Sequence, residues 1–274
     1  MRKKNVLSSP HLLKSKKKRR RLAFGKTFFY LFLLTGVFVG LVYASSFSRF
    51  NIKGVEVIGA KVVDEAEIRK VAEEELSGKY LWLFPRSNFL IYPKSKMGDR
   101  LLDNFKTLKS ATIKLTGEES LSIEITEREP RFIWCGRSPE ESGECYFMDE
   151  GGFIFAPAPY FSGNVYFKFF GDVGSVAPEG VSFASSNFGK LSVYKDVAIN
   201  LGLDVSHFVV SQEGGAALYF QKKSGVARII FPLDKDAEKT ADNLALVLGS
   251  EDLKDKLEAL EYIDLRFGNK VYYK

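Results

Sequence analysis

The feature that most constrains this chain is an apolar run over residues 27–44, which no charged residue interrupts. A helix rises about 1.5 Å per residue and the hydrocarbon core of a bilayer is about 30 Å thick, so this run needs only the flanking residues up to Phe47 to cross it. The sequence therefore predicts one membrane-spanning helix over 27–47. The other apolar stretches are short and broken by charges, Gly or Pro, and they predict no second span.

Positive charge lies on one side of this run. Residues 1–26 contain eleven Lys and Arg residues and no acidic residue, which is typical of a cytoplasmic flank. We therefore expect a type II protein of the cell membrane, with 1–26 in the cytoplasm and the chain after about Ser46 exported. The competing interpretation is a signal peptide cut before Ser45, after Val42 and Ala44. The apolar run exceeds the usual signal core of about 7–15 residues, which favours an uncleaved anchor.

The charge of the remainder differs from that of the tail. The net charge of +6 is the sum of +11 from residues 1–26 and −5 from the rest, which holds 29 basic and 34 acidic residues. The part of the chain that is long enough to fold is therefore mildly acidic, and we expect no nucleic-acid binding. The basic tail is expected to contact anionic membrane lipid.

Two cysteines, Cys135 and Cys145, flank a polar segment rich in turn-forming residues. Both lie on the predicted exported side, where disulfides persist. A disulfide between them would close a hairpin loop and contribute about 2–3 kcal/mol. Free thiols and a metal site are the alternatives, but the sequence holds only two histidines, His11 in the tail and His207 far along the chain. The pattern favours the disulfide, and no metal or cofactor is expected.

In the first exported region the spacing of apolar residues changes along the chain between the alternation of a strand and the three-to-four-residue spacing of a helix. The predicted order is strand, helix, helix, strand, strand, over residues 52–59, 64–76, 95–104, 111–115 and 121–125. Asp64 occupies the N-cap position of the first helix. The aromatic connection 79–93 is expected to cap the neighbouring core, rather than to form a ligand pocket or a membrane-surface patch.

The second exported region predicts mainly strands. They cover 131–135, 144–155, 165–170, 207–211, 216–221 and 227–232, with helices near 188–201 and 236–248. The fold class is therefore α+β: an N-terminal transmembrane helix, a small three-stranded domain, and a larger, mainly antiparallel β-rich domain with helices on one side.

Five stretches resemble successive signatures of the FtsQ/DivIB cell-division proteins: FNIKGVEVIG, GKYLWLF, SLSIEITEREPRFIW, MDEGGFIF and LEYIDLRFGNKVYYK. The resemblance implies a POTRA domain over 49–127 and an FtsQ-like β domain over 128–274. The EREP step at 127–130 matches the junction between the two, and DEGG at 149–152 matches an aspartate-glycine turn. The loop between Cys135 and Cys145 departs from the family pattern.

The resemblance also implies a function. It indicates a non-enzymatic septal scaffold that recruits and holds FtsB- and FtsL-type membrane-anchored division proteins, together with other septal wall-synthesis proteins, and that takes no small-molecule substrate. The alternatives are a POTRA-type module for polypeptide transport or assembly, and a membrane-tethered wall hydrolase. No nucleophile motif or phosphate-binding glycine loop occurs, and His207 in LDVSHFVV is typical of a strand residue rather than a base.

The predicted partner site is the C-terminal end. A last strand with no successor leaves backbone groups unpaired, and such an edge favours the addition of a strand from a partner. In the family this region contacts the FtsB-type protein, and Phe267 stands where the family has an aromatic residue. The competing interpretation is that Leu265 and Phe267 pack on the 236–248 helix. The candidate partner-binding residues are Leu265, Phe267, Gly268, Asn269, Lys270, Val271, Tyr272 and Tyr273.

Overall fold

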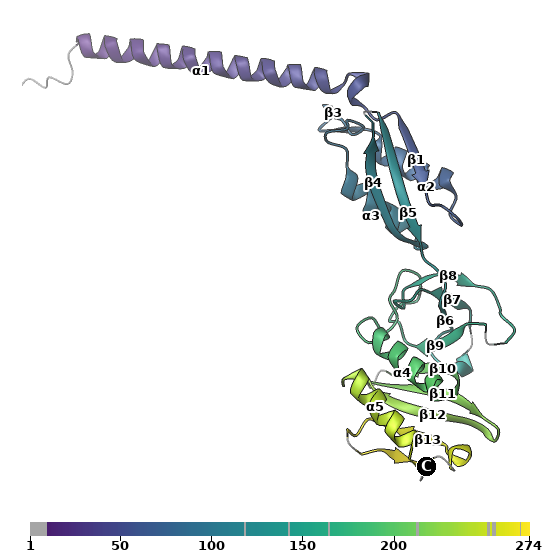
Figure 1. Cartoon of the computed structure of the whole chain (residues 1–274). Helices are drawn as coiled ribbons and strands as arrows, with labels where there is room; N and C mark the ends of the chain where they lie inside the picture. Colours follow the sequence, from purple (N-terminus) through teal and green to yellow (C-terminus); the bar gives the residue numbers. More distant parts are fainter. Residues whose placement is uncertain are drawn as a thin grey trace, which may run out of the picture. The chain divides into compact units, whose positions relative to one another are not determined.

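The computed structural model describes residues 10–117, 119–141, 143–163, 165–211, 214–250, 253, 256–268 and 270–274, with side chains from Leu22 onward. Two compact units make up the chain. The first comprises Met1–Leu101 with Ala111–Ile125, and the second comprises Leu102–Ser110 with Thr126–Lys274. The described residues form a mixed α+β structure that begins with one long apolar helix and contains one large β-sheet (Figure 1).

The long helix α1 covers Pro10–Ser45, and its part Leu22–Ser45 is long and apolar enough to cross a membrane. None of the apolar window of this span is buried inside the protein, as expected for side chains that face lipid. The helix begins well before the apolar run, because Lys and Arg are good helix formers. It ends at Ser45, where the amide of Ser46 bonds to the carbonyl of Tyr43 in a turn.

The remainder of the first unit contains a three-stranded sheet in the order β1-β5-β4, with β1 parallel to β5. Asp64 Oδ1 accepts a hydrogen bond from the Ala66 amide (2.9 Å), so the predicted N-cap is present. A hairpin, β2–β3, lies in the aromatic connection and was not expected. The elements that lie in this unit or cross its bounds are η2 (Ser48–Phe50), β1 (Gly54–Ile58), α2 (Glu65–Leu76), β2 (Lys79–Tyr80), β3 (Phe84–Pro85), α3 (Lys94–Asn104), β4 (Leu108–Thr116) and β5 (Ser120–Glu127).

An ion pair joins α2 to α3 in this unit. The buried carboxylate of Glu75 accepts from Arg100 and lies 3.0 Å from Lys96 Nζ. The hydrogen bond from Arg100 is the main reason that the pKa of Glu75 is lowered, and it outweighs the opposing effect of burial. The acidic run in α2 thus includes one structural contact as well as solvated residues.

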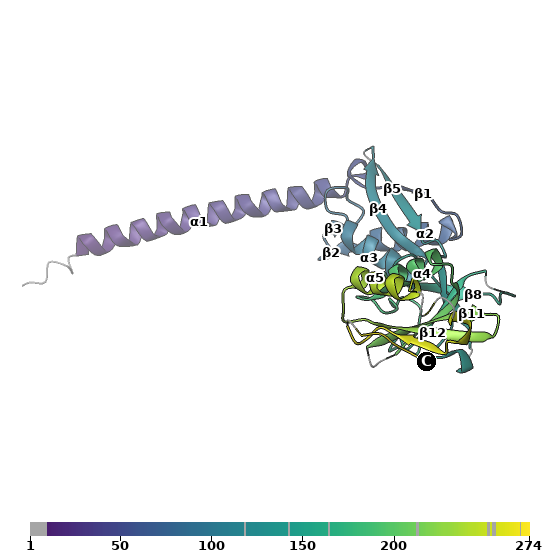
Figure 2. The same cartoon turned by 60° about the horizontal axis from the view of Figure 1, so that its bottom comes forward.

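The second unit is built on a nine-stranded sheet with the described order β14-β13-β12-β11-β10-β9-β6-β7-β8 (Figures 1 and 2). Its elements are β6 (Phe132–Trp134), η3 (Pro139–Glu141), β7 (Cys145–Met148), β8 (Ile154–Ala158), β9 (Phe167–Gly171), α4 (Phe188–Asn200), β10 (Asp204–Val210), β11 (Gly215–Lys222), β12 (Gly225–Pro232), α5 (Ala237–Leu248), η4 (Leu257–Ala259), β13 (Tyr262–Asp264) and β14 (Tyr272–Tyr273).

This sheet is more mixed than the sequence predicted. Among the described strands, five pairings are antiparallel and three are parallel: β6 with β9, β9 with β10, and β12 with β13. Two of the parallel pairs follow from helices, because α4 connects β9 to β10 and α5 connects β12 to β13. Strand patterns alone indicate where strands lie but not which neighbours they take.

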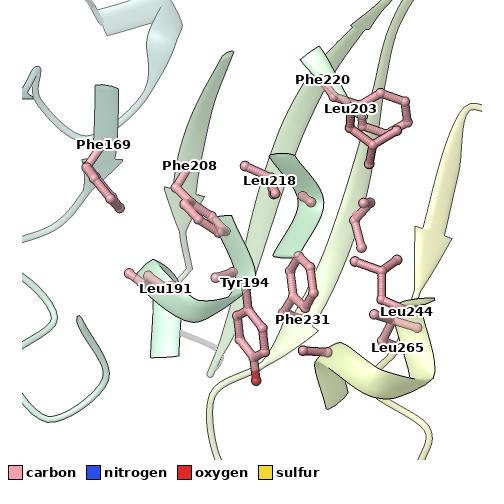
Figure 3. Packing of buried hydrophobic residues seen from close by; sticks show 14 of the residues in the cluster. Phe169, Leu191, Tyr194, Leu203, Phe208, Leu218, Phe220, Phe231, Leu244 and Leu265 are labelled. Atoms are coloured by element: carbon pink, nitrogen blue, oxygen red, sulfur yellow. The ribbon is translucent and has the colours of Figure 1, made fainter. Parts of the chain in front are cut away.

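A large aromatic core lies in this unit. Figure 3 shows strand residues such as Phe208 and Leu218 pointing toward Leu191 and Tyr194 of α4. The Tyr194 ring stacks on Phe231 with centroids 4.1 Å apart, and its buried hydroxyl donates to the Pro232 carbonyl at 3.1 Å. A tyrosine is tolerated at this depth because its one polar group has a partner.

Candidate functional site

The predicted C-terminal edge is the outermost strand of the nine-stranded sheet. β14 pairs antiparallel with β13, and no described strand lies on its other side. Lys274 and Tyr262 exchange hydrogen bonds in both directions, at 3.2 and 3.3 Å. Because such pairs alternate along an antiparallel ladder, the backbone N–H and C=O of Tyr273 face away from β13. The described structure thus leaves this donor and acceptor available to an added strand.

Aromatic side chains lie beside this free edge. The rings of Phe267 and Tyr272 meet edge to face with centroids 5.0 Å apart. Phe267 is 56% exposed, and Tyr272 and Tyr273 are about half exposed. Side chains on neighbouring strand positions point to opposite faces, so Tyr272 and Tyr273 offer an aromatic contact on each face of the sheet.

A shallow cavity of about 260 Å³ adjoins the edge on the side of α5. It is lined by Leu246, Val247, Ser250, Leu253, Val271 and Tyr273. Leu246 is largely exposed although it lies in a helix that packs on the core. A strand added beside β14 would therefore meet the Phe267–Tyr272 pair on one face and this apolar cavity on the other.

The turn between β13 and β14 is fixed by a charged pair. The buried carboxylate of Asp264 accepts from the Arg266 amide (3.0 Å), from its Nε (3.0 Å) and from its Nη2 (2.7 Å). Burial acts to raise the pKa of Asp264, but the hydrogen bonds and charge of Arg266 outweigh it and lower that pKa. The Arg266 guanidinium also lies 5.9 Å from the centroid of the Phe267 ring. This pair therefore positions the aromatic contact.

The predicted partner residues separate into different environments. Leu265 does not belong to an exposed surface: it is 3% exposed and packs in the core of the unit, so we remove it from the candidate site. Gly268 has φ +71°, a conformation that other residues rarely adopt. Lys270 is exposed and Val271 is half-buried. Asn269 lies outside the described residues.

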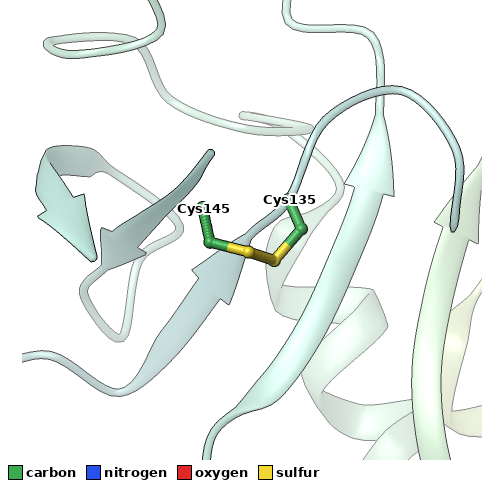
Figure 4. Close-up of a disulfide and its surroundings, with 2 residues drawn as sticks. All are labelled: Cys135 and Cys145. Atoms are coloured by element: carbon green, nitrogen blue, oxygen red, sulfur yellow. A yellow bond between two sulfur atoms is a disulfide. The ribbon is translucent and has the colours of Figure 1, made fainter. Parts of the chain in front are cut away.

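Cys135 and Cys145 form a disulfide in the structure, with Sγ atoms 2.01 Å apart (Figure 4). The register Trp134↔Tyr146 makes the two cysteines the next opposed pair of the β6–β7 ladder. The disulfide therefore closes the base of the loop that joins these strands, as the spacing predicts. It lies toward the β8 end of the sheet order, which is the end opposite β14.

A cavity of about 850 Å³ adjoins this disulfide. Lys168 and His207 contribute polar groups to its lining. The His207 ring stacks on Tyr219 at 4.5 Å between centroids, and burial, followed by the charge of Lys168, lowers the pKa of His207. The lining is otherwise largely apolar: Ile133, Cys135, Pro139, Gly143, Glu144, Cys145, Pro157, Ala158, Pro159, Tyr160, Phe161 and Phe170.

The hydrogen bonds of His207 do not suit a catalytic base for its neighbour. Ser206 Oγ lies 3.0 Å from His207 Nδ1 and donates to the Tyr219 carbonyl at 3.1 Å. A hydroxyl has one proton to donate, so His207 Nδ1 acts as donor to Ser206 and does not accept its proton. Among the described residues, no group of three or more His, Cys, Asp or Glu side chains could hold a metal ion.

The two motifs that mark the start of the second region meet in the second unit. Arg128 of the EREP step donates from Nη1 to the buried Asp149 of the DEGG turn, and its guanidinium lies 3.8 Å from the centroid of the Phe153 ring. Asp149 Oδ1 also accepts from the Gly151 and Phe153 amides, at 2.9 and 3.0 Å. These contacts join the two motifs to each other, which the spacing of the motifs in the sequence did not predict.

No protein-family model matches the chain, and no curated protein matches it.

Proposed function

We propose that this chain is a membrane-anchored scaffold of the division septum, of the FtsQ/DivIB type. In this proposal α1 is an uncleaved anchor with the basic tail in the cytoplasm. Residues 49–127 are a POTRA domain with a docking surface of its own, and residues 128–274 capture FtsB- and FtsL-type partners. The helix long enough to span a membrane and the resemblance described above support this assignment.

The observation that carries the proposal is the free edge at β14, defined by Phe267, Tyr272 and Tyr273 together with the adjoining cavity. An extended partner segment would form main-chain hydrogen bonds with Tyr273, and each such bond contributes about 0.5–1.5 kcal/mol. A two-residue strand offers few of these bonds. Most of the affinity must therefore come from the aromatic side chains and the cavity.

Capture of the partner by the full chain tests the proposal. The protein is reconstituted in vesicles, and binding of the exported segment of an FtsB-type protein is measured for wild type, Phe267→Glu and Tyr160→Glu. Tyr160 is a matched control, because it is 95% exposed and follows β8 at the other end of the sheet order.

We expect Phe267→Glu to weaken binding at least about 30-fold, since central aromatic contacts often contribute about 2 kcal/mol or more. Tyr160→Glu should bind like wild type. Equal binding by all three proteins would contradict the proposed site, and equal loss in both variants would contradict its location at β14.

A further inference from the structure

The hairpin β2–β3 presents two large apolar residues of its turn to the outside. Leu81 is 81% exposed and Trp82 is 90% exposed. Both have positive φ, 49° and 59°, a left-handed conformation that is costly for residues other than glycine. The expectation that this connection caps a core is therefore wrong for these two residues. Backbone strain that displays a tryptophan outward indicates a function for the turn.

This hairpin lies beside the end of the predicted membrane span. The ring of Phe84 in β3 meets the ring of Phe38 in α1 edge to face, with centroids 6.0 Å apart. Both views place β3 next to the carboxyl end of α1 (Figures 1 and 2). Phe38 lies seven residues before Ser45, the last residue of α1, which is about 10 Å along the axis at about 1.5 Å per residue.

Hydrogen bonds fix this arrangement. Asn88 Nδ2 donates to the Ser45 carbonyl at 3.1 Å, and Asn51 Nδ2 donates to the Phe47 carbonyl at 2.8 Å. The Ile52 amide bonds to the Ser87 carbonyl at 2.8 Å. Side chains therefore satisfy one carbonyl at the end of α1 and one just beyond it, and Asn88 ties the segment after β3 to the helix. The depth of the hairpin relative to the span is set by these contacts.

The composition of the same segment suits a lipid surface. Residues 77–98 contain Lys79, Arg86, Lys94 and Lys96 and no acidic residue, among a high proportion of aromatic and aliphatic residues. The guanidinium of Arg86 lies 5.5 Å from the centroid of the Tyr80 ring, next to the hairpin turn. Tryptophan favours the boundary between headgroups and acyl chains, and basic residues favour the phosphates above it.

We propose that Leu81 and Trp82 insert into the headgroup–acyl boundary of the leaflet from which α1 emerges, with Lys79 and Arg86 against anionic lipid phosphates. This inference rests on the proposed role of α1 as a membrane anchor. The span Leu22–Ser45 is about 36 Å long at about 1.5 Å per residue, which exceeds a hydrocarbon core of about 30 Å, so Ser45 lies near the headgroups and Phe38 lies below them. Phe84, in contact with Phe38, brings the hairpin to that depth.

Quenching of tryptophan fluorescence in vesicles tests this inference. The full chain is reconstituted in phosphatidylglycerol–phosphatidylethanolamine vesicles whose acyl chains carry bromine at shallow or deep positions. The sequence holds two tryptophans, and Trp134 is buried in the second unit, so the difference between wild type and Trp82→Phe reports Trp82. We expect blue-shifted Trp82 emission, quenched more by shallow than by deep bromine.

A pair of variants gives a second readout. The double variant Leu81→Asp, Trp82→Glu should lose the lipid contact, so deuterium uptake of residues 79–92 in vesicles should rise about tenfold. Val62→Asp is the matched control. Val62 is 82% exposed and lies in the turn that follows β1, at the end of the sheet away from α1. This variant should leave the deuterium uptake of residues 79–92 unchanged.

The outcomes separate this inference from the anchor on which it rests. Loss of flotation with vesicles after an alkaline carbonate wash would overturn the anchor. Retained flotation with unquenched, water-exposed Trp82 emission would overturn the lipid contact alone. Crosslinking through position 82 to a second copy or to a partner protein, with unquenched emission, would assign the hairpin to that protein instead and likewise overturn the proposal.

Discussion

The two edges of the nine-stranded sheet, β8 and β14, end in different ways. At β8, segment 180–182 covers one end of the outer side: the Ile154 amide bonds to the Val181 carbonyl at 2.9 Å, and the Gly180 amide bonds to the Ile154 carbonyl at 2.8 Å. Pro157 interrupts the rest of this strand, and proline has no N–H to offer. The β8 edge is therefore protected against strand addition.

At β14 the described structure shows none of these devices. Tyr273 directs its N–H and C=O outward, and the strand contains two tyrosines and no proline. Natural sheets usually cover or interrupt their edges, so an edge that has neither a covering segment among the described residues nor a proline, and that carries Phe267 and Tyr272, is the place where we propose that a partner binds. The proposed binding function at β14 is therefore supported by the absence of proline, and of a covering segment in the described structure, as much as by the aromatic side chains.

The largest expected effect on binding comes from removing the open edge. Deletion of residues 268–274 takes away β14, both tyrosines and one wall of the adjoining cavity. We expect capture of an FtsB-type segment to fall at least about 100-fold, since several central contacts of about 2 kcal/mol are lost together. Capture is measured by titration, and near-ultraviolet circular dichroism checks that the core persists. Undiminished capture by the folded truncation would place the binding edge elsewhere.

A change at the protected β8 end of the sheet should lower stability and leave capture of the partner unchanged. Replacing Cys135 and Cys145 by Ser removes the disulfide near the β8 end. We expect the free energy of unfolding to fall by about 2–3 kcal/mol, because the reduced chain gains conformational freedom when unfolded. Urea denaturation measures this loss. Capture should stay unchanged under conditions where the variant is folded, and a parallel loss of capture would break the distinction between the two ends.

A smaller effect on affinity is expected from the loss of one backbone group of β14, the N–H of Tyr273. Tyr273→Ala and Tyr273→Pro both remove the aromatic ring, but only the proline variant also removes the outward N–H. The N–H has no partner within the sheet, so its loss should cost the partner one hydrogen bond, about 0.5–1.5 kcal/mol, or roughly 2- to 12-fold in Kd. Titration of both variants gives this ratio. Identical affinities would argue against strand addition and in favour of side-chain contact alone.

The smallest expected effect is on stability. It concerns Asp264, which holds the turn before Phe267. Its pKa is lower in the folded protein than the unfolded value of about 3.9, so its stabilising contribution is present above about pH 4 and is lost as the pH falls through the folded pKa. We expect Asp264→Asn to reduce stability at pH 7 and to flatten this acid dependence. Denaturation between pH 7 and pH 3 measures both.

Arg266→Gln provides the matched variant for this prediction. It leaves the buried Asp264 carboxylate without its guanidinium partner, so the pH at which stability is lost should rise. An unchanged acid dependence in both variants would show that this pair does not hold the turn.

Periodicity and capping predicted the elements of this chain well, because they are local properties. Asp64 caps its helix, and most strands of the second unit lie close to where alternation places them. The single strand predicted over 144–155 is wrong, because the DEGG turn divides it into β7 and β8, which pair with each other. The neighbours of each strand could not be predicted, since α4 and α5 act as crossovers that make parallel pairs. Alternation also grouped Leu265 with Phe267, but β13 ends at Asp264, and the turn after it buries one side chain and exposes the other.

Some features have no local signal in the sequence. The contact between Arg128 and Asp149 joins residues 21 positions apart, and the outward display of Trp82 depends on the left-handed conformation of Leu81 and Trp82. Leu246 resembles any apolar residue of an amphipathic helix until its exposure beside Tyr273 is seen. Such features arise from tertiary packing, which overrides local propensity.

Hydrogen exchange at the two edges tests the central claim most directly. Deuterium uptake of the full chain in vesicles is followed with and without a saturating FtsB-type segment, comparing residues 270–274 with residues 154–158. Strand addition at the open edge predicts that uptake by 270–274 slows at least about tenfold while uptake by 154–158 stays the same. Protection at 154–158, or binding with no change at 270–274, would contradict the account.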